Sequence, residues 1–525
     1  MPEPADVLIV GAGPAGLLLA GELRLAGVRP LVIERLPERS GAPKANGMIG
    51  QVVRLLDHRG LYERFTGAEA RPRPLPGFLF GALPLALAEL DVNPLYGLGI
   101  PQRRIEQLLE ERALELGADI RRGHELVGFS QDGDGVTADV RGPDGAVEFR
   151  ARYLVGCDGG HSVVRKLAGI GFPGVTTADS VSRVAQVTIP EEFFTEKREL
   201  DVPGYGRIRP AFTRTARGMF SFVELEPKNP IIGTAEWGGE VDENAPMSLA
   251  ELRESVRRVL GADLPMSEPT TPHEPLLRRS TGHNTRLAER YRDGRVLLAG
   301  DAAHVHSGLG GPGLNLGLQD VFNLGWKLAA QLRGWAPDDL LDSYEAERRP
   351  AAERVVMHTL AQSALVAPGS EVDALRELFG ELLSKKDNIR HIAELMAGPD
   401  VRYPTDSPHP LAGLLVPDLD LTHPVTRVAE LLRSARPVLL DFAGDPALAE
   451  AARPWADLVD LVRVESDDPP ADAMLIRPDG YVAWAGGDGL RAALEKWFGQ
   501  RSATSVLPRC STSTSPTEST WTAPE

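Results

Sequence analysis

Cysteine is nearly absent from this sequence, whose 525 residues include only Cys157 and Cys510. The two lie far apart, and neither belongs to a CxxC pair or to a cluster with the spacing of zinc ligands. A disulfide framework and a structural zinc site are therefore excluded as organising features. Two free thiols in a reducing compartment are expected instead.

Long hydrophobic runs are also lacking. No apolar segment approaches the ~20 residues that a helix needs to span a bilayer. The first residues include no basic segment, and their apolar run is too short for a secretory signal peptide. We therefore expect a cytoplasmic protein that does not associate with a membrane.

Positive charge is in the minority, with 57 Lys and Arg against 74 Asp and Glu and a formal net charge of −17. This balance argues against nucleic acid and anionic lipid as general partners. The content of 42% hydrophobic and 25% charged residues is ordinary for a globular enzyme. The expected partner is a small molecule, and the expected assembly is a monomer or a homodimer.

One glycine-rich stretch near the start has the pattern of a dinucleotide-binding turn. It follows the apolar run 6–10 and precedes a segment with helical spacing, and a second apolar run, 30–33, ends in Glu34. Strand, glycine turn, helix, strand and acid follow one another in the order that a dinucleotide needs. The stretch consists of Gly11, Ala12, Gly13, Pro14, Ala15 and Gly16.

Each part of this motif has a physical role. Gly11 allows a tight turn, Gly13 lets the backbone approach a pyrophosphate, and Gly16 lets the helix pack on the strand. The N–H groups at the start of the helix attract phosphate, and Glu34 can accept hydrogen bonds from an adenosine ribose. The motif by itself leaves both FAD and NAD open as ligands.

Apolar periodicity divides the rest of the chain into domains. An α/β nucleotide-binding domain is expected in two parts, residues 1–175 and 286–395, around an α+β insertion at 176–285. A small α/β domain is expected at 400–499. The Ser/Thr/Pro-rich tail 500–525 is expected to be disordered.

Individual elements are predicted from periodicity and from the placement of Gly and Pro. Helices are expected at 51–62, 101–116, 249–260, 313–332, 339–367 and 490–498. Strands are expected at 181–189, 219–225, 231–237, 295–299, 438–442, 458–464, 474–477 and 481–484.

Two later stretches complete a pattern with the dinucleotide turn. They are Cys157-Asp158-Gly159-Gly160-His161-Ser162-Val163-Val164-Arg165, and Gly300-Asp301-Ala302-Ala303-His304 continued by Gly310-Gly311-Pro312-Gly313-Leu314-Asn315. In this order, the GxGxxG, DG and GD motifs resemble the flavoprotein aromatic hydroxylases, which are single-component FAD monooxygenases of the para-hydroxybenzoate hydroxylase type. The resemblance covers residues 5–365.

The C-terminal region, with no CxxC, resembles the thioredoxin-like domain of the larger members of that family. These members include phenol hydroxylase and the bacterial hydroxylases that tailor aromatic polyketides and antibiotics. The implied fold is α/β, with a Rossmann-type FAD-binding domain, an inserted α+β substrate domain and a C-terminal thioredoxin-like domain.

The resemblance also implies a cofactor site. Asp301 would accept a hydrogen bond from the ribityl chain of FAD, and the glycines after it would bring backbone N–H groups to the isoalloxazine. Asp158 and Gly159 would serve both FAD and the pyridine nucleotide, with Arg165 on the conventional basic position. The other implied cofactor-binding residues are Arg35, Lys44, Gln102, Leu126, Gly310, Gly311, Gly313, Leu314 and Asn315.

This sequence departs from the family at two places. Lys44 stands where the family usually has Arg, which keeps the charge but loses the bidentate geometry. Gly308 stands where the family has Pro beside the flavin ring, and Pro312 replaces a polar residue. Because glycine is permissive, the loop is expected to be more flexible and to leave more room near the ring.

The implied reaction consumes NAD(P)H and O2 and hydroxylates an aromatic substrate through a flavin C4a-hydroperoxide. Since the cofactor carries the hard chemistry, no protein nucleophile is required. By analogy with the larger members of the family, the expected substrate is a bulky, polycyclic phenol of the polyketide type. No catalytic residue is certain, and the candidates in the insertion are Tyr205, Arg207, Arg214, Trp237 and His283.

Three other functions stay open at this point: Baeyer–Villiger oxygenation of a polycyclic ketone, FAD binding without oxygenase activity, and an NAD-dependent dehydrogenase. His304 and His306 are not expected to bind a metal, because no carboxylate cluster accompanies them. A solvated helix face is expected to hold Glu106, Glu110, Glu111 and Glu115.

Overall fold

The dinucleotide-turn region has the predicted strand, turn and helix. The computed structural model describes residues 5–39, 45–224, 228–238, 241–242, 245–269, 275–423 and 425–501. Strand β1 (Ala5–Val10) leads into helix α1 (Pro14–Leu25), which is followed by β2 (Pro30–Glu34). β1 and β2 pair in parallel. Pro14 opens α1, where its fixed φ suits the first turn.

These strands lie in an eight-stranded sheet with the order β18-β19-β10-β1-β2-β7, and β8 and β9 extend it beyond β10. The pairs β1–β10 and β10–β19 are parallel, so the carboxyl ends of all three strands lie at one edge of the sheet. Each of the three glycine-containing motifs follows one of these strands. The remaining strands are β7 (Asp119–Arg122), β8 (Glu125–Gln131), β9 (Val136–Gly142), β10 (Gly145–Gly156), β18 (Arg292–Asp293) and β19 (Val296–Leu298).

Helices cover this sheet. α1 packs against α4 (Gln102–Glu115) and α7 (Pro312–Arg333), and α8 (Ser343–Val366) lies along α7. The helix predicted at 51–62 is wrong as a single element, because it forms two helices, α2 (Gln51–Asp57) and α3 (Leu61–Thr66). Gly60 separates them with φ +66°, a left-handed conformation that no α-helix interior accepts.

A second, six-stranded sheet has the order β14-β15-β16-β11-β17-β20. Helix α6 (Leu249–Leu260) covers one of its faces and shares a core with it that includes Phe220 and Ile232. The strand predicted at 181–189 forms as the longer β11, because it pairs with both β16 and β17. The strands are β11 (Gly174–Gln186), β14 (Ala211–Thr215), β15 (Gly218–Val223), β16 (Ile231–Trp237), β17 (Leu277–Leu287) and β20 (His304–Val305).

Short elements cover the outer end of this assembly. Helices α9 and α10 and the hairpin β4–β5 share a small core that includes Phe80 and Leu365. These four elements are β4 (Phe78–Phe80), β5 (Leu83–Leu85), α9 (Ser370–Leu382) and α10 (Lys386–Ala397). Other short elements lie elsewhere, namely β3 (Gly47–Ile49), β6 (Gly97–Gly99), β12 (Leu200–Val202), β13 (Gly206–Ile208) and α5 (Val163–Leu167), the last of which packs on β8 and β10.

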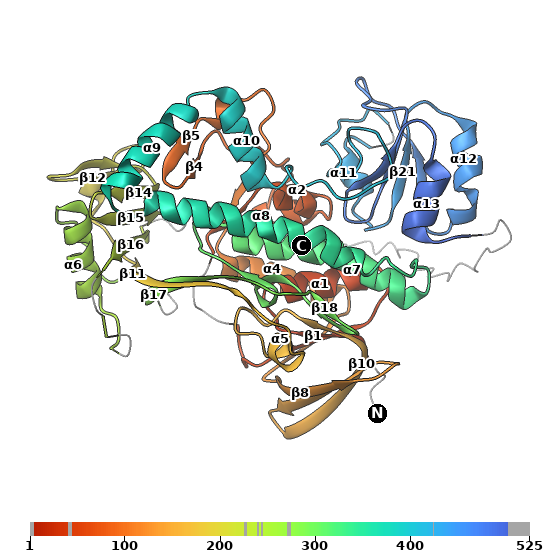
Figure 1. Ribbon diagram of the computed structural model, residues 1–525, viewed down its shortest axis with the longest axis horizontal. Coiled ribbons are helices and arrows are strands. Elements are labelled where there is room, and N and C mark those ends of the chain that lie inside the picture. Colours follow the sequence, from red (N-terminus) through yellow and green to blue (C-terminus); the bar gives the residue numbers. More distant parts are fainter. Residues whose placement is uncertain are drawn as a thin grey trace, which may run out of the picture.

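The C-terminal region forms a four-stranded mixed sheet with the order β22-β21-β23-β24. In Figure 1 this domain, drawn in blue, lies at the opposite end of the molecule from the second sheet, and α7 and α8 run between them. Its core includes Trp455 and Phe498. Its elements are α11 (Val428–Leu431), β21 (Val438–Asp441), α12 (Pro446–Ala452), β22 (Asp460–Arg463), β23 (Ala473–Ile476), β24 (Val482–Ala485) and α13 (Leu490–Phe498).

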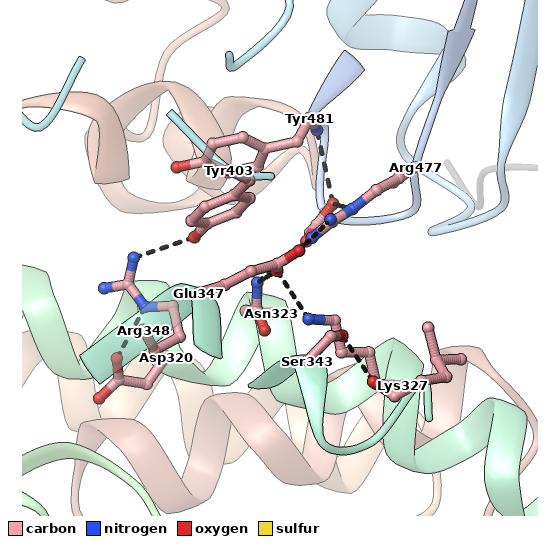
Figure 2. A network of polar contacts seen from close by, with 11 residues as sticks. Asp320, Asn323, Lys327, Ser343, Glu347, Arg348, Tyr403, Arg477 and Tyr481 are labelled. Carbon is pink, nitrogen blue, oxygen red and sulfur yellow. Dashed lines mark hydrogen bonds and ion pairs between the residues drawn. The ribbon is translucent and has the colours of Figure 1, made fainter. Parts of the chain in front are cut away.

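A buried ionic network joins this domain to α7 and α8 (Figure 2). Glu347 on α8 binds Arg477, which follows β23, through two hydrogen bonds of 2.6 and 2.8 Å. Lys327 on α7 donates to the same carboxylate at 2.6 Å. Although burial opposes ionisation, the charges of Arg477 and Lys327 hold the pKa of Glu347 at about 2. The carboxylate therefore stays ionised in the interior and ties three elements together.

A second branch of the network leads toward the end of β19. Asp320 on α7 accepts from Arg348 Nε at 2.8 Å and lies 2.6 Å from His304 Nε2. Arg348 also donates to the Tyr403 hydroxyl at 3.0 Å, and the Tyr403 ring stacks on Tyr481 at 4.1 Å between centroids. His304 is thus held in place by a buried carboxylate from α7.

Two predicted features concern the membrane and the thiols. The helices in the described part of the chain include none with the length and apolarity of a membrane span. Cys157 is a free, half-buried thiol at the end of β10, and burial raises its pKa. Cys510 and the tail beyond residue 501 lie outside the described residues.

Candidate active site

A cavity of about 1440 Å³ opens at the edge where β1, β10 and β19 end, and it extends to the second sheet. Gly13 lies at one end of it, Asp301 in the middle and Ser221 on the second sheet. Ordinary small-molecule sites enclose ~300–1,000 Å³. The cavity therefore has room for an extended ligand and a second molecule beside it.

The glycines of the dinucleotide turn differ in what surrounds them. Gly11 has φ +107°, and an added Cβ would lie 2.5 Å from the Cys157 carbonyl oxygen. A Cβ on Gly16 would lie 2.0 Å from the Gly11 carbonyl oxygen. A Cβ on Gly13 would meet no atom of the described residues within 4 Å. Gly11 and Gly16 are thus required by the packing of the protein, whereas Gly13 leaves space open on the cavity wall.

Glu34 lies at the end of β2, beside this turn. Its carboxylate accepts hydrogen bonds from the N–H groups of Ala12 and Leu36, each at 2.9 Å. Each oxygen has capacity for a further hydrogen bond. Arg35 follows it on the exposed rim of the cavity, while Lys44 lies outside the described residues.

The Asp158 stretch organises the loop after β10. Asp158 accepts from the Ser162 hydroxyl at 2.6 Å and from the Val163 N–H at 2.7 Å, and so caps the start of α5. Burial raises the pKa of Asp158, against the effect of these hydrogen bonds. Gly159 has φ +81°, and a Cβ there would meet no protein atom within 4 Å. The backbone of Gly159 therefore forms another open part of the cavity wall.

Arg165 is only 4% exposed, so it is not a solvated surface charge. Its guanidinium donates to the carbonyl oxygens of Ala302 and Gly160, at 2.8 and 2.9 Å, and lies over the Phe172 ring. It is not among the residues that line the cavity. Its contacts join the loop after β10 to the loop after β19.

The loop after β19 brings Asp301 and the start of α7 to the cavity. Asp301 is exposed there, and Gly310, Gly313 and Leu314 line the wall beside it. Gly311 is the N-cap of α7, with φ +67°, and a Cβ there would meet no protein atom within 4 Å. The free N–H groups and the dipole of this 22-residue helix favour negative charge at that point.

Asn315 is buried and bonded to the protein. Its side-chain carbonyl oxygen accepts from the Ile49 N–H at 3.1 Å, and its amide donates to the Gly311 carbonyl at 2.7 Å. It therefore orders the first turn of α7 against β3. Gly308, in the same loop, is exposed on the cavity wall with open space at its Cα.

Gln102 begins α4 at the cavity wall, and Leu126 on β8 lines the wall beyond it.

The carboxylates on α4 were expected to lie on a solvated face, and this expectation is wrong at two positions. Glu106 is 9% exposed and accepts from Gln102 Nε2 at 2.8 Å. Glu110 is bound by Arg39 and Arg122. The helical period placed these side chains on one face, but only the packing of residues 39 and 122 shows that this face is covered.

Two of the five candidates in the insertion line the cavity, namely Trp237 and His283. His283 Nδ1 lies 3.1 Å from the Thr177 hydroxyl, and burial lowers the pKa of its imidazole. Tyr205 and Arg207 are exposed outside the cavity wall. Arg214 donates to the Ala367 carbonyl and pairs with Asp373, so it anchors the chain after α8.

His306 is a residue of the cavity wall that the motif analysis did not select. Its Nδ1 lies 3.0 Å from the Ser307 carbonyl oxygen, which can only accept, so Nδ1 carries the proton. Nε2 is then a buried acceptor with no hydrogen-bond partner among the residues that the structure describes. Burial lowers the pKa of His306 to about 4, so the ring is neutral near pH 7. The sequence could have identified His306 as a site residue, because it closely follows the motif that contains Asp301.

The sequence also did not predict that residues of the second sheet together form one wall of the cavity. Its residues face the cavity in two rows across neighbouring strands, because side chains alternate along each strand. One row consists of Phe212, Ser221, Gly233, Val184 and Arg278, and the other of Met219, Ala235, Ser182 and Ser280.

Buried neutral histidines predict an acid-sensitive fold. Burial lowers the pKa of both His306 and His358 to about 4. In the unfolded chain these histidines bind a proton near pH 6.5. Their contribution to the free energy of unfolding is therefore fully present above that pH and is lost as the pH falls toward 4. When the pH is lowered from 7 to 5.5, the two histidines together should reduce the free energy of unfolding by roughly 2 kcal/mol. Thermal unfolding of the wild type and of His358→Gln measures this, and an equal pH dependence in both would contradict it.

Comparison with protein families gives two matches along the chain. Residues 4–359 match the family model described as FAD binding domain. Residues 409–501 match the model described as aromatic-ring hydroxylase, C-terminal. The first match contains all three glycine motifs, and the second contains the four-stranded C-terminal sheet.

Three relatives extend over nearly the whole chain. The 12-dehydrotetracycline 5-monooxygenase/anhydrotetracycline 6-monooxygenase of Streptomyces rimosus subsp. rimosus is 45% identical over 512 residues, which cover 94% of this chain and 99% of the relative. The solved structure of OxyS anhydrotetracycline hydroxylase from Streptomyces rimosus is 44% identical, covers 95% of this chain and 100% of that chain, and has a TM-score of 0.83. The dialkyldecalin synthase of Streptomyces rugosporus is 38% identical over 510 residues, which cover 94% of this chain and 98% of the relative.

Proposed function

This chain belongs to the FAD-dependent aromatic-ring hydroxylases and is an FAD-dependent monooxygenase, and from that premise we propose that it hydroxylates a flat, polycyclic phenol of the polyketide type. Members of the class use NAD(P)H and O2. The overall balance is aromatic C–H, O2, NAD(P)H and a proton giving C–OH, water and NAD(P)+. One oxygen atom enters the substrate and the other leaves as water.

The observation that carries the substrate class is the wall formed by the second sheet. Its two rows are built mainly from small side chains, among them Gly233, Ala235 and Ser182. Five neighbouring strands spaced by about 4.8 Å give this wall a width of roughly 19 Å. A broad surface whose middle is formed by small side chains, with Phe212 and Arg278 at its two edges, suits a flat fused-ring molecule, whereas a single phenol ring would occupy only a small part of it.

We propose that FAD lies along the edge where the three parallel strands end. The open space at Gly13, Gly159 and Gly311 supports this placement, because each backbone can approach a ligand without a clashing Cβ. Glu34 would hold the adenosine ribose and Asp301 the ribityl chain. The start of α7 would stabilise negative charge on the flavin. When bound, FAD supplies the transfer of electrons to O2 and the delivery of one oxygen atom.

The protein's own residues would then position the substrate and exclude water. The neutral His306 offers a buried acceptor at Nε2, which suits a phenolic O–H donor close to the flavin end of the cavity. Trp237 and Met219 give apolar contacts on the second sheet. We further propose that the enzyme works in the cytoplasm as a monomer or a homodimer.

A second candidate is FAD binding without oxygenation. It is favoured by one relative, because a protein 38% identical over nearly the whole chain is named a dialkyldecalin synthase rather than a monooxygenase. The open space at Gly308, beside Asp301 in the cavity wall, agrees with altered oxygen chemistry. The two candidates differ in whether substrate stimulates the consumption of NAD(P)H.

The test is NAD(P)H oxidation by the FAD-loaded protein with anhydrotetracycline as the first probe, followed by other polycyclic phenols. We expect substrate to accelerate oxidation at least tenfold and the product to gain one atom from isotopic O2 at an aromatic carbon. Label in a ring-expanded lactone would indicate Baeyer–Villiger oxygenation instead. Unstimulated oxidation across the panel, with flavin fully bound, would contradict the proposal in favour of the second candidate.

A further inference from the structure

We propose that Arg278 is a specificity-determining residue that binds an acidic oxygen substituent at the end of the substrate remote from the ring that is oxidised. The substituent is a carboxylate or the ionised enol of a 1,3-dicarbonyl group. This inference rests on the proposed function, because it deepens the description of the same substrate cavity. Under this inference the substrate must carry a negatively charged group in addition to its polycyclic shape.

The position of Arg278 follows from the register of the second sheet. Arg278 on β17 lies opposite Val184 on β11, which lies opposite Gly233 on β16. Gly233 in turn lies opposite Ser221 on β15. All four residues line the cavity. Arg278 therefore ends a row of uncharged, mostly small side chains and is the charged group of that row.

The guanidinium of Arg278 has no carboxylate partner among the residues that the structure describes. Its neighbour Arg279 points to the other face, where it binds Glu251 at 2.7 Å. Arg183, on the adjacent strand, is likewise paired with Glu236 and Glu251. The arginines on the α6 side of the sheet thus have carboxylate partners in the protein, whereas Arg278 on the cavity wall has none in the described part of the chain.

The distance along β17 separates Arg278 from the flavin end of the cavity. β17 pairs with β20 near Arg286, next to the loop that contains His306. Gly282 and His283 also line the cavity, between that point and Arg278. The four steps along the strand from residue 278 to residue 282 span roughly 13 Å. A ligand that reaches both ends must have several fused rings, so the charged group and the oxidised ring lie at opposite ends of it.

Arginine chemistry defines the class of substituent. A guanidinium stays protonated in proteins and presents parallel N–H donors that match two oxygens of a carboxylate or of a 1,3-dicarbonyl enolate. Ser280, two residues along β17, lines the same wall and supplies a hydroxyl for a neighbouring oxygen. A charge-assisted contact of this kind changes affinity by about tenfold or more.

The test is isothermal titration calorimetry of the FAD-loaded protein with two probes. One is rhein, a flat dihydroxyanthraquinone with a terminal carboxylate, and the other is its uncharged methyl ester. We expect the wild type to bind the acid at least tenfold more tightly than the ester. Arg278→Gln should remove this preference, and Arg278→Lys should keep part of it. Arg207→Gln is the matched control, because Arg207 is an exposed arginine outside the cavity wall.

Equal affinities for acid and ester in the wild type, or a preference that survives in Arg278→Gln, would overturn the inference, as would failure of both probes to bind. A weaker apparent affinity for NADPH in Arg278→Gln, with unchanged binding of the acid, would assign the residue to the reductant and would also overturn it. The proposed function is decided separately, since stimulated NAD(P)H oxidation by uncharged polycyclic phenols would support it even when the charge preference fails.

Discussion

Glu347→Ala is expected to destabilise the folded protein by roughly 3–5 kcal/mol, because it removes the buried carboxylate that Lys327 and Arg477 share. Lys327 is then left uncompensated, and Arg477 keeps only its pairing with Asp479. Glu347 is 2% exposed and is bound at once by Arg477, Lys327 and Asn323. Lys327 is fully buried, and the Glu347 carboxylate is the one acceptor of its ammonium among the described residues. Burial, opposed by Glu347, already lowers the pKa of Lys327 to about 8, so deprotonation would relieve only part of the loss.

The measurement is thermal and urea unfolding of the FAD-loaded protein. Glu353→Ala is the matched control on the same helix, because Glu353 pairs with Arg349 at the surface with half of its side chain exposed. Such a pair is worth about 0–1 kcal/mol. If the two variants lose the same stability, the network of Figure 2 does not hold the C-terminal domain to α7 and α8.

The second large effect is expected for Gly13→Ala, which should lower FAD retention at least tenfold while changing the free energy of unfolding of the apoprotein by no more than about 1 kcal/mol. Gly13 has φ −79°, which alanine adopts without strain. An added methyl group meets no protein atom within 4 Å. Gly13 is the N-cap of α1, where alanine in place of glycine costs about 1 kcal/mol or less. Any loss of flavin must then come from contact between the new methyl group and the cofactor.

Flavin absorbance per mole of purified protein gives the retention, and thermal unfolding of the apoprotein gives the stability. Gly21→Ala is the control, because it lies in the same helix α1 and an added methyl would come no closer than 3.9 Å to Leu116. It should keep its flavin. Full flavin content in Gly13→Ala would place the pyrophosphate elsewhere and would contradict the role proposed for this turn.

Local patterns were sufficient for many of the elements. Strand β16 and helices α6 and α13 form at the residues that periodicity and Gly or Pro signals predict. These signals act over a few residues, so the sequence contains them directly. The interruption of the predicted helix at Gly60 was not predicted, because the sequence around a single glycine inside an apolar pattern does not determine whether its φ is positive.

Side-chain roles at the motifs depended on contacts that are distant in sequence. Asp158 caps α5, and Arg165 binds the Ala302 carbonyl 137 residues away, so both order the loops of the cavity from within the protein. Glu106 is buried for a similar reason, since a helix face is solvated only where no other segment covers it.

The sequence by itself determined the ligand class and the order of the elements that hold it, because the glycine motifs act through local backbone geometry and through helix ends. Only the tertiary structure decided which residues share the cavity with that ligand. The row that ends at Arg278 exists because strands from residues 180 to 280 pair in one register, and a shift by one residue would turn every side chain to the opposite face. Pairing over such separations depends on the whole sheet, so no local pattern contains it.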